Sequence, residues 1–406
     1  MINRSEIMDF AREFGLDPNV VEKDYALGWL LAGISQQMEL GTNWVFKGGT
    51  CLKKCFFETF RFSEDLDFTL KDPVHLNESF LLRAFKDVTA WVYEASGIEM
   101  PEDMLRFEIF TNVRGTTSAQ GRISYRGPMQ RGSDLPRIKL DLTADEILVQ
   151  SPVMLEVHHP YSDKPSNGIH IQCYRFEEVF AEKIRALGER ERPRDLYDVV
   201  HPYRHESFNP DRRILLTTLE KKCQFKGIQV PTVLLLNSKP ERLELESEWS
   251  SMLAHQLPFL PPFRQFWDEL PELFEWLYGV TKTPFSRIPT DKGIDTSWRP
   301  PAMAQAWHAG VPLEIIRFAA VNRLCVDLGY GGRRRLVEPY SLRRTTDGNL
   351  LLFGVKHRTG ELRSYRVDRM QGAMVTQTSF FPRYMIELTD PGPISANRVK
   401  RRTRTI

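Results

Sequence analysis

The chain has 406 residues, of which 41% are hydrophobic and 27% are charged, with a formal net charge of +2. This composition predicts a folded globular protein of two or three domains and argues against a disordered or fibrous chain. No run of about eighteen apolar residues predicts a membrane span, and five cysteines without CxxC spacing predict reduced thiols in a cytoplasmic protein.

Charge is spread unevenly along the chain. Residues 301–406 hold 18 Lys/Arg and 8 Asp/Glu, a balance of +10, so the remaining residues carry 37 basic and 45 acidic side chains, a balance of −8. Such asymmetry predicts that the C-terminal part meets a polyanion. Mutual attraction between the two parts of the chain is the alternative.

The first part of the chain is predicted to mix helices with strands. Apolar residues at helical spacing indicate helices, and strict alternation indicates half-buried strands. We expect helices over residues 4–15, 18–40 and 77–96, strands over 106–114, 121–127 and 138–143, and a loop over 115–122.

The central motif is FKGGTCLKKCFFETFRFSEDLDF at residues 46–68. Side chains alternate along a strand, so Asp65 and Asp67 are expected on one face while Leu66 points into a core. Paired carboxylates that repel each other suit Mg²⁺. The glycines Gly48 and Gly49 allow a backbone turn to approach a phosphate closely.

A third carboxylate is expected beside this pair. In PRIKLDLTADE, Ile138, Leu140 and Leu142 alternate with polar residues, and Asp141 lies on the polar face. Two cations between phosphate and protein need about three shared ligands, so Asp141 is the candidate third ligand. An exposed strand carboxylate without a function is the alternative.

A second informative stretch covers residues 170–200. Its helical wheel puts Lys183 in the middle of an apolar face, so the ammonium either reaches out to solvent or meets an anion in a cleft. Pro193 can open the next helix, where Asp195 and Asp198 lie three positions apart on one face.

These motifs together resemble one family. GGT followed by RFSEDLDF, the EKDY of residues 22–25, and AEKIRALGERERPRDLYD at 181–198 resemble the AbiEii/AbiGii-type and MenT toxins, a branch of the polymerase-β-type nucleotidyltransferases. The resemblance covers roughly residues 15–280. It implies an α+β fold, with a nucleotidyltransferase core at residues 1–204 and a helical bundle packed on it at 205–280.

The resemblance also implies roles for individual residues. Lys183 would contact nucleotide phosphate and Asp195 would orient or activate the acceptor, while Asp198 is a weaker candidate. The expected catalytic residues are Asp65, Asp67, Lys183 and Asp195; the expected Mg²⁺ ligands are Asp65, Asp67 and Asp141; and the expected nucleotide-binding residues are Gly48, Gly49, Thr50, Lys53, Arg61, Ser63 and Arg194.

The C-terminal part differs in character. Residues 281–301 form the expected linker, 393–406 a basic tail, and the short strands between them resemble a WYL domain, a small SH3/Sm-like β-barrel over 302–392. The Trp-Tyr-Leu triplet is replaced by three leucines at 350–352. WYL domains present basic residues to nucleic-acid or nucleotide ligands, and the matching positions here are Arg363, Arg366 and Arg369.

The function implied is that of a cytoplasmic, Mg²⁺-dependent nucleotidyltransferase toxin of a toxin–antitoxin or abortive-infection (phage defence) system. It would transfer NMP from an NTP to an RNA acceptor such as the 3′ end of tRNA, and a cognate antitoxin protein would oppose it. Two alternatives remain: nucleotide binding or transfer to a protein or small molecule, and a nucleic-acid-responsive regulator whose barrel is the working part.

Overall fold

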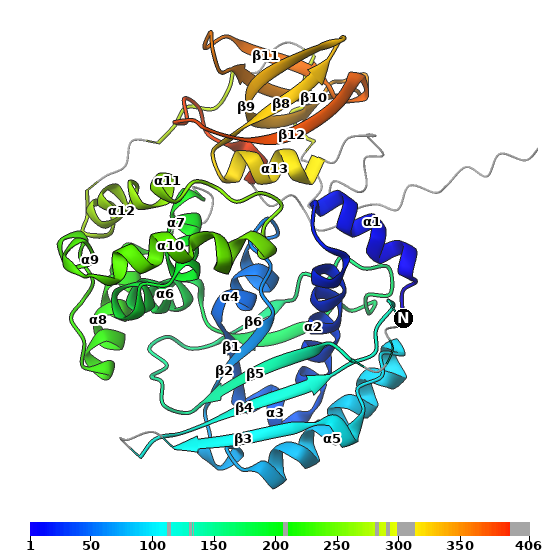
Figure 1. The fold of residues 1–406 in the computed structure, drawn as a ribbon, viewed down its shortest axis with the longest axis vertical. Coiled ribbons are helices and arrows are strands. Elements are labelled where there is room, and N and C mark those ends of the chain that lie inside the picture. Colours follow the sequence, from blue (N-terminus) through cyan, green and yellow to red (C-terminus); the bar gives the residue numbers. More distant parts are fainter. Residues whose placement is uncertain are drawn as a thin grey trace, which may run out of the picture. The chain divides into compact units, whose positions relative to one another are not determined.

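The computed structural model describes residues 1–406 except 112–114, 130–131, 133, 206–209, 281–283, 290–292, 299–312 and 390–406. The chain forms two compact units, Met1–Thr283 and Pro284–Ile406 (Figure 1). Within the described residues no helix is both long and apolar enough to span a membrane. The predicted tail at 393–406 lies outside the described residues, as do parts of the predicted linker.

The first unit is built on a mixed seven-stranded sheet in the order β3-β4-β5-β2-β1-β7-β6. The β2–β5 and β1–β7 pairs are parallel and the other pairs are antiparallel. Its strands are β1 (Trp44–Lys47), β2 (Asp65–Leu70), β3 (Arg106–Thr111), β4 (Thr117–Ser124), β5 (Arg137–Thr143), β6 (Val153–Glu156) and β7 (His170–Cys173).

Helices pack around this sheet. Helix α2 contacts both α5 and β7, and α5 contacts β3 (Figure 1). The helices are α1 (Arg4–Phe14), α2 (Pro18–Gln36), α3 (Met38–Asn43), α4 (Gly48–Cys51), a π-helical turn (Leu52–Phe56), α5 (Glu78–Ser96), α6 (Phe176–Arg190), α7 (Pro193–Arg204), α8 (Arg212–Lys226), α9 (Val233–Ser238), α10 (Glu241–Leu253), α11 (Phe263–Trp267) and α12 (Leu270–Leu277). Single 3₁₀ turns cover Pro73–His75, Glu102–Met104, Ala254–Gln256, Val367–Arg369 and Glu387–Thr389.

Local sequence explains where several helices begin and end. The side chain of Asp17 accepts a hydrogen bond from the backbone N–H of Asn19, and Pro18 occupies the first position of α2. Asn77 caps α5 in the same way, and Gly97 ends it in the left-handed conformation. The sequence therefore predicts the limits of α5 to within one residue.

Two local predictions were wrong. The expected helix over 18–40 is interrupted, because Gln37 is extended and its side chain caps a separate helix, α3. The expected loop over 115–122 falls largely within β4, which pairs with β3 and β5 along its length. The residues of β4 are mostly small or polar, which is typical of a loop. They nevertheless form a strand with Ala119, Gly121 and Ile123 buried on one side.

The second unit is an open antiparallel sheet with a helix packed against it. Its strand order is β11-β10-β9-β8-β12, and α13 contacts β8, β9 and β12. Among the described residues the outer strands β11 and β12 do not pair, so the expected closed barrel is corrected to a five-stranded sheet. The elements are α13 (Leu313–Val321), β8 (Leu324–Tyr330), β9 (Arg333–Arg344), β10 (Leu350–Lys356), β11 (Leu362–Arg366) and β12 (Met370–Ser379).

A compact apolar cluster forms a core of this unit. It contains Cys325, Tyr340, Phe353 and Phe380 from the sheet region and Ile288 from the predicted linker. Residue Ile294, also in that segment, pairs with Thr345. The described parts of residues 284–298 therefore pack with the second unit.

Candidate active site

Three carboxylates converge on neighbouring strands of the first unit. Asp67 on β2 pairs directly with Asp141 on β5 and with Lys47 on β1, while Asp65 pairs with Lys139. Directly paired side chains project from the same face of a sheet, and so do side chains two positions apart on one strand. Parallel pairing of β2 with β5 thus places all three carboxylates on one face.

The negative charge of these carboxylates is only partly balanced. Burial raises the pKa of Asp67 to about 6; repulsion from Asp141 and Asp65 adds to this shift, while Lys183 and Lys47 oppose it. Burial also raises the pKa of Asp65, and repulsion from Asp141 adds to that effect. A cation between the three groups would relieve this repulsion, and oxygen-only ligands suit a hard divalent ion.

Asp141 differs from the other two because it already has partners. Its carboxylate lies 2.7 Å from the ammonium of Lys139 and accepts a hydrogen bond of 3.1 Å from the amide of Gln120 on β4. Both partners lie on the polar sheet face near the site. Gln120 lies on β4, the neighbour of β5 on the side opposite β2, and Lys139 lies on β5 itself.

The glycine turn rests directly on the aspartate strand. Gly48 has a φ of +81°, and a Cβ atom placed on it would lie 2.2 Å from a carboxylate oxygen of Asp67. A Cβ on Gly49 would lie 2.4 Å from the Arg61 guanidinium and 3.4 Å from the hydroxyl of Ser63. The hydroxyl of Thr50 donates to the backbone carbonyl of Asp65 at 2.5 Å. The turn and the carboxylates therefore form one continuous site.

Asp198 joins two of the predicted cationic residues. Both carboxylate oxygens accept hydrogen bonds of 2.6 Å from Arg61, and one lies 2.8 Å from the ammonium of Lys183. Although burial alone would raise the pKa of Asp198, the charges of Arg61 and Lys183 lower it. Asp198, the weaker candidate in the sequence, is thus the common anchor of Arg61 and Lys183.

A second arginine–aspartate pair lies at the start of α7. Arg190 donates to both oxygens of fully buried Asp195, at 2.7 and 2.8 Å. The side chain of Arg190 remains 57% exposed, and its hydrogen bonds to Asp195, helped by the charges of Asp67 and Asp198, raise its pKa. Arg190 therefore lies within electrostatic range of the site carboxylates.

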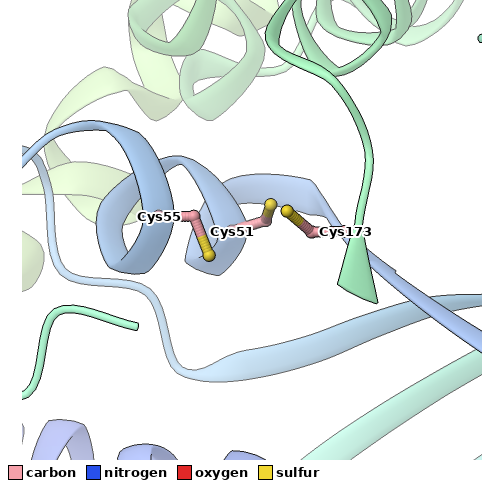
Figure 2. Close-up of side chains that lie close together, drawn as sticks. All are labelled: Cys51, Cys55 and Cys173. Atoms are coloured by element: carbon pink, nitrogen blue, oxygen red, sulfur yellow. The ribbon is translucent and has the colours of Figure 1, made fainter. Parts of the chain in front are cut away.

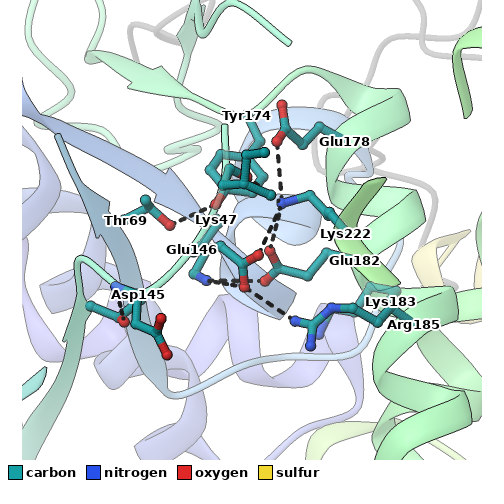
Figure 3. A network of polar contacts seen from close by, with 12 residues as sticks. Lys47, Thr69, Asp145, Glu146, Tyr174, Glu178, Glu182, Lys183, Arg185 and Lys222 are labelled. Carbon is teal, nitrogen blue, oxygen red and sulfur yellow. Dashed lines mark hydrogen bonds and ion pairs between the residues drawn. The ribbon is translucent and has the colours of Figure 1, made fainter. Parts of the chain in front are cut away.

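A buried ionic network supports the site from behind (Figure 3). The ammonium of Lys222 on α8 lies 3.2 Å from Glu178 and 3.3 Å from Glu182, both on α6. Glu182 also lies 3.2 Å from Lys47, the residue that immediately precedes the glycine turn. Arg185 approaches Glu146 at 3.2 Å. The network ties the end of β1 to helices α6 and α8.

Several predicted site residues lie in other settings. Lys53 is buried, where its ammonium donates to the backbone carbonyl of Glu58 and lies 4.6 Å from the ring centre of Phe62. Arg194 lies near enough to Asp65 for their charges to interact, and its Nε is 3.5 Å from the carbonyl of Met252. The proposed roles of Lys53 and Arg194 in nucleotide binding stay predictions.

The arginines predicted to meet a ligand belong to the second unit. Arg363 forms an ion pair with Glu361, and Arg366 pairs with Asp368 at 2.7 Å. Arg363 and Arg366 are three positions apart on β11, and strand alternation turns them toward opposite faces. Arg369 follows in an exposed turn. Their role in ligand binding stays a prediction.

Three residues near the carboxylates were missed in the sequence. Lys47 and Lys139 were overlooked because their positions opposite Asp67 and Asp65 depend on strand register. Arg190 lies at the end of α6, and its contact with Asp195 depends on the turn into α7. Only the position of Lys47 next to the glycine pair could have drawn attention to it.

Two protein families match separate parts of the chain, one in each compact unit. Residues 29–277 match the family described as nucleotidyl transferase AbiEii toxin of a type IV toxin–antitoxin system, and residues 312–375 match the WYL domain. No curated protein matches the chain.

Similar solved structures include MenT4, a nucleotidyltransferase toxin from Mycobacterium tuberculosis H37Rv, with 18% identity and a TM-score of 0.46, covering 69% of this chain and 91% of that one. JHP933 from Helicobacter pylori has 14% identity and a TM-score of 0.42, covering 65% of this chain and 93% of its own. A nucleotidyltransferase described from H. pylori has 16% identity and a TM-score of 0.40, covering 65% and 96%. Because the AbiEii match spans more than half of the sequence, the chain belongs to the AbiEii family of nucleotidyltransferase toxins.

Proposed function

We propose that this nucleotidyltransferase uses Mg²⁺ to transfer a nucleoside monophosphate from an NTP to an RNA acceptor, such as the 3′ end of tRNA. The observation that carries this proposal is the set of three carboxylates on adjacent strands beside a glycine turn. The pKa of Asp67, raised to about 6 by burial and by its acidic neighbours, fits a site built to receive a cation.

Asp65, Asp67 and Asp141 are the residues that would hold the metal. When bound, Mg²⁺ supplies charge neutralisation to the triphosphate and to the leaving pyrophosphate. Strands β2 and β5 need not shift to bring the three carboxylates together, because their pairing in the sheet already fixes the spacing of these residues. This fixed geometry favours positioning as the main contribution of the protein to the rate.

The nucleotide phosphates would lie over Gly48, Gly49 and Thr50, and the lack of side chains at the two glycines leaves room for Asp67 and Arg61 to pack against this turn. Lys183 and the exposed part of Arg190 would meet phosphate oxygens from the α6 side. The acceptor hydroxyl oxygen would then form a bond to the α-phosphorus while the bond to pyrophosphate breaks, and the hydroxyl proton would leave to a site carboxylate or to water. Lys183 keeps its orientation through Asp198.

An RNA acceptor is supported by the charge of the chain. Residues 301–406 carry 18 basic and 8 acidic side chains, and a basic surplus favours a polyanion. Modification of a tRNA 3′ end would block aminoacylation and arrest growth, which fits a toxin of a toxin–antitoxin or phage-defence system. In that setting an antitoxin protein would be the partner.

Label transfer tests the proposal. Wild-type protein and Asp67→Asn would be incubated with Mg²⁺, each α-³²P-labelled NTP in turn, and total tRNA, and the products resolved on a denaturing gel. We expect label on tRNA with the wild type and its loss in Asp67→Asn. Asp9→Asn on exposed helix α1 is the matched control and should retain transfer.

The site of the label separates the alternatives. Label on a polypeptide instead of tRNA would replace the RNA acceptor by a protein acceptor. Unchanged transfer by Asp67→Asn would reject the carboxylate site itself. The absence of label with every NTP, in the presence of Mg²⁺ and tRNA, would contradict the proposed reaction.

A further inference from the structure

Three of the five cysteines come together beside the glycine turn (Figure 2). The sulfur atoms of Cys51, Cys55 and Cys173 all lie within 4.8 Å of one another. Cys51 and Cys173 are buried and Cys55 is half-buried. All three are free thiols, and neither the spacing in the sequence nor the proposed nucleotide transfer accounts for their meeting.

The local fold explains the convergence. Cys51 ends α4 and Cys55 lies four positions later in the π-helical turn, so both project from the same side of this helical segment. Cys173 ends β7, which runs parallel to β1 and pairs with it at Phe46. Since β1 leads directly into α4, the pairing of β1 with β7 delivers the third thiol. Single π turns of this kind are frequent at functional sites.

The separation of the sulfurs fits a shared metal ion. With metal–sulfur bonds of about 2.3 Å, sulfurs in trigonal or tetrahedral coordination lie roughly 3.8–4.0 Å apart. No two of the three sulfurs lie more than 4.8 Å apart, which exceeds these distances by at most about 1 Å. A disulfide would join two of the sulfurs and leave the third thiol buried next to it, so it explains the trio less well.

The hydrogen bonding within the trio supports this assignment. The thiols of Cys51 and Cys55 both form hydrogen bonds with the sulfur of Cys173, so the three side chains are already in mutual contact. Cysteines bind a metal as thiolates, so a bound ion would replace the thiol protons. Thiolates select soft ions and discriminate against Mg²⁺, which prefers oxygen ligands.

We propose that Cys51, Cys55 and Cys173 bind one soft metal ion, of the Zn²⁺ or Cu⁺ class, through three thiolate sulfurs. Up to three thiol protons leave as the three metal–sulfur bonds form, and no electron is transferred. Bound metal would fasten the helical segment that begins with the Gly48–Gly49 turn to the end of β7. The trio therefore provides a structural or regulatory metal site distinct from the carboxylates.

Metal titration of the full chain tests this site. Reduced, metal-stripped protein would be titrated anaerobically with Zn²⁺ or with Cu⁺ in separate arms, against a chromophoric chelator and with excess Mg²⁺ to occupy the carboxylates. We expect one equivalent to bind, a thiolate-to-metal charge-transfer band with Cu⁺, and proton release. The metal content of the protein as purified, compared with these two affinities, identifies the ion, and the readout does not depend on nucleotide transfer.

Variants decide whether the trio is responsible. Cys55→Ser, at the half-buried position, should weaken binding by at least about 100-fold, and Cys173→Ser should do the same. Cys223→Ser, which changes a buried thiol of α8 outside the trio, is the matched control and should bind as the wild type does. Circular dichroism of each variant separates loss of a ligand from loss of the fold.

Two results would overturn the proposal. In the first, the folded wild type binds both Zn²⁺ and Cu⁺ no more tightly than folded Cys55→Ser does. The other is binding that persists in the Cys51→Ser, Cys55→Ser, Cys173→Ser triple variant. A disulfide between two of the three cysteines in protein isolated under non-reducing conditions, together with no metal uptake after reduction, would replace the metal site by a redox pair.

Discussion

The carboxylate of Asp67 is expected to serve the function of the site and to lower the stability of the fold. Its pKa in the folded protein is about 6, because of burial and its acidic neighbours, against an ordinary value of 3.8. A raised carboxyl pKa means that the folded state binds the proton more tightly than the unfolded state does. The contribution to stability is present below the unfolded pKa and is lost as pH rises through about 6.

We therefore expect Asp67→Asn to be inactive and yet more stable than the wild type at pH 7. Two pKa units correspond to about 3 kcal/mol, which sets the upper size of the gain. The gain should shrink as the pH falls from 7 toward 4. Urea unfolding followed by circular dichroism at both pH values measures the difference in the free energy of unfolding.

The control for this prediction is Asp9→Asn, which changes an exposed surface carboxylate and should alter stability little at either pH. Mg²⁺ should raise the unfolding midpoint of the wild type more than that of Asp67→Asn, since only the wild type keeps the full ligand set. A lower stability of Asp67→Asn than of the wild type at pH 7 would contradict the view that the ionised Asp67 carboxylate destabilises the folded protein.

The close contact between Gly48 and Asp67 can be tested separately from the positive φ of Gly48. In Gly48→Ala the new methyl group would meet the Asp67 carboxylate, so we expect loss of nucleotide transfer in a folded protein. Gly227→Ala is the matched control, because Gly227 also has a positive φ, +68°, but has no atom within 4 Å of the added Cβ. Both variants carry the same kind of backbone strain, of about 1 kcal/mol.

Transfer rate and melting temperature of the two alanine variants provide the measurement. Similar melting temperatures with transfer lost only in Gly48→Ala would assign the loss to crowding of Asp67. Equal transfer in both variants would show that the turn tolerates a side chain and does not hold the phosphates closely.

At the scale of elements, Asp198 holds three segments together. It lies on α7 and binds Lys183 of α6 and Arg61 of the segment before β2. We expect Asp198→Ala to lower the free energy of unfolding by about 3–5 kcal/mol, because it leaves two buried cations without their counter-ion. Chemical denaturation measures this loss.

A double-mutant cycle checks that the loss comes from the ion pair. Adding Arg61→Met to Asp198→Ala should recover part of the stability, since one buried charge is then removed. Strict additivity of the two changes would show that Arg61 and Asp198 stabilise the fold independently. Loss of stability no greater than that of Asp9→Ala on the surface would contradict the role of Asp198 as an anchor.

The elements also show what the sequence could predict. The aspartate strand β2, helix α5 and the place of Lys183 on the apolar face of its helix followed from local periodicity, which reads one segment at a time. Local periodicity did not predict which other strands and helices these segments would contact. Lys47 faces Asp67 and Cys173 meets Cys51 only because β1 pairs with β2 on one side and with β7 on the other.

The failures have the same origin. The small, polar residues that open β4 predict a loop, and they form a strand because they pair with β3 and β5. The second unit was expected to close into a barrel, yet closure depends on whether its outer strands meet, which no local pattern encodes. Asp141 was predicted correctly as a strand residue, and its alignment with Asp67 required the register.

For the whole molecule, the division into two compact units separates the candidate active site from the basic surplus of the chain. All the carboxylates and the glycine turn lie in Met1–Thr283, and the balance of +10 lies in residues 301–406. If the basic surplus attracts RNA, as proposed, catalysis and RNA attraction belong to different units. A fragment of residues 1–283 should therefore fold and still transfer nucleotide, but bind RNA more weakly than the full chain does.

The salt dependence of RNA binding tests this assignment. The logarithm of the binding constant falls with the logarithm of salt concentration, with a slope of about 0.7 for each phosphate contacted on a single strand. We expect a steep slope for the full chain, a shallow one for residues 1–283, and an intermediate one when only residues 393–406 are removed. Fluorescence anisotropy with labelled tRNA provides the slopes. Equal slopes for the full chain and the fragment would place the RNA contacts on the first unit, and the charge asymmetry would then reflect attraction between the parts of the chain.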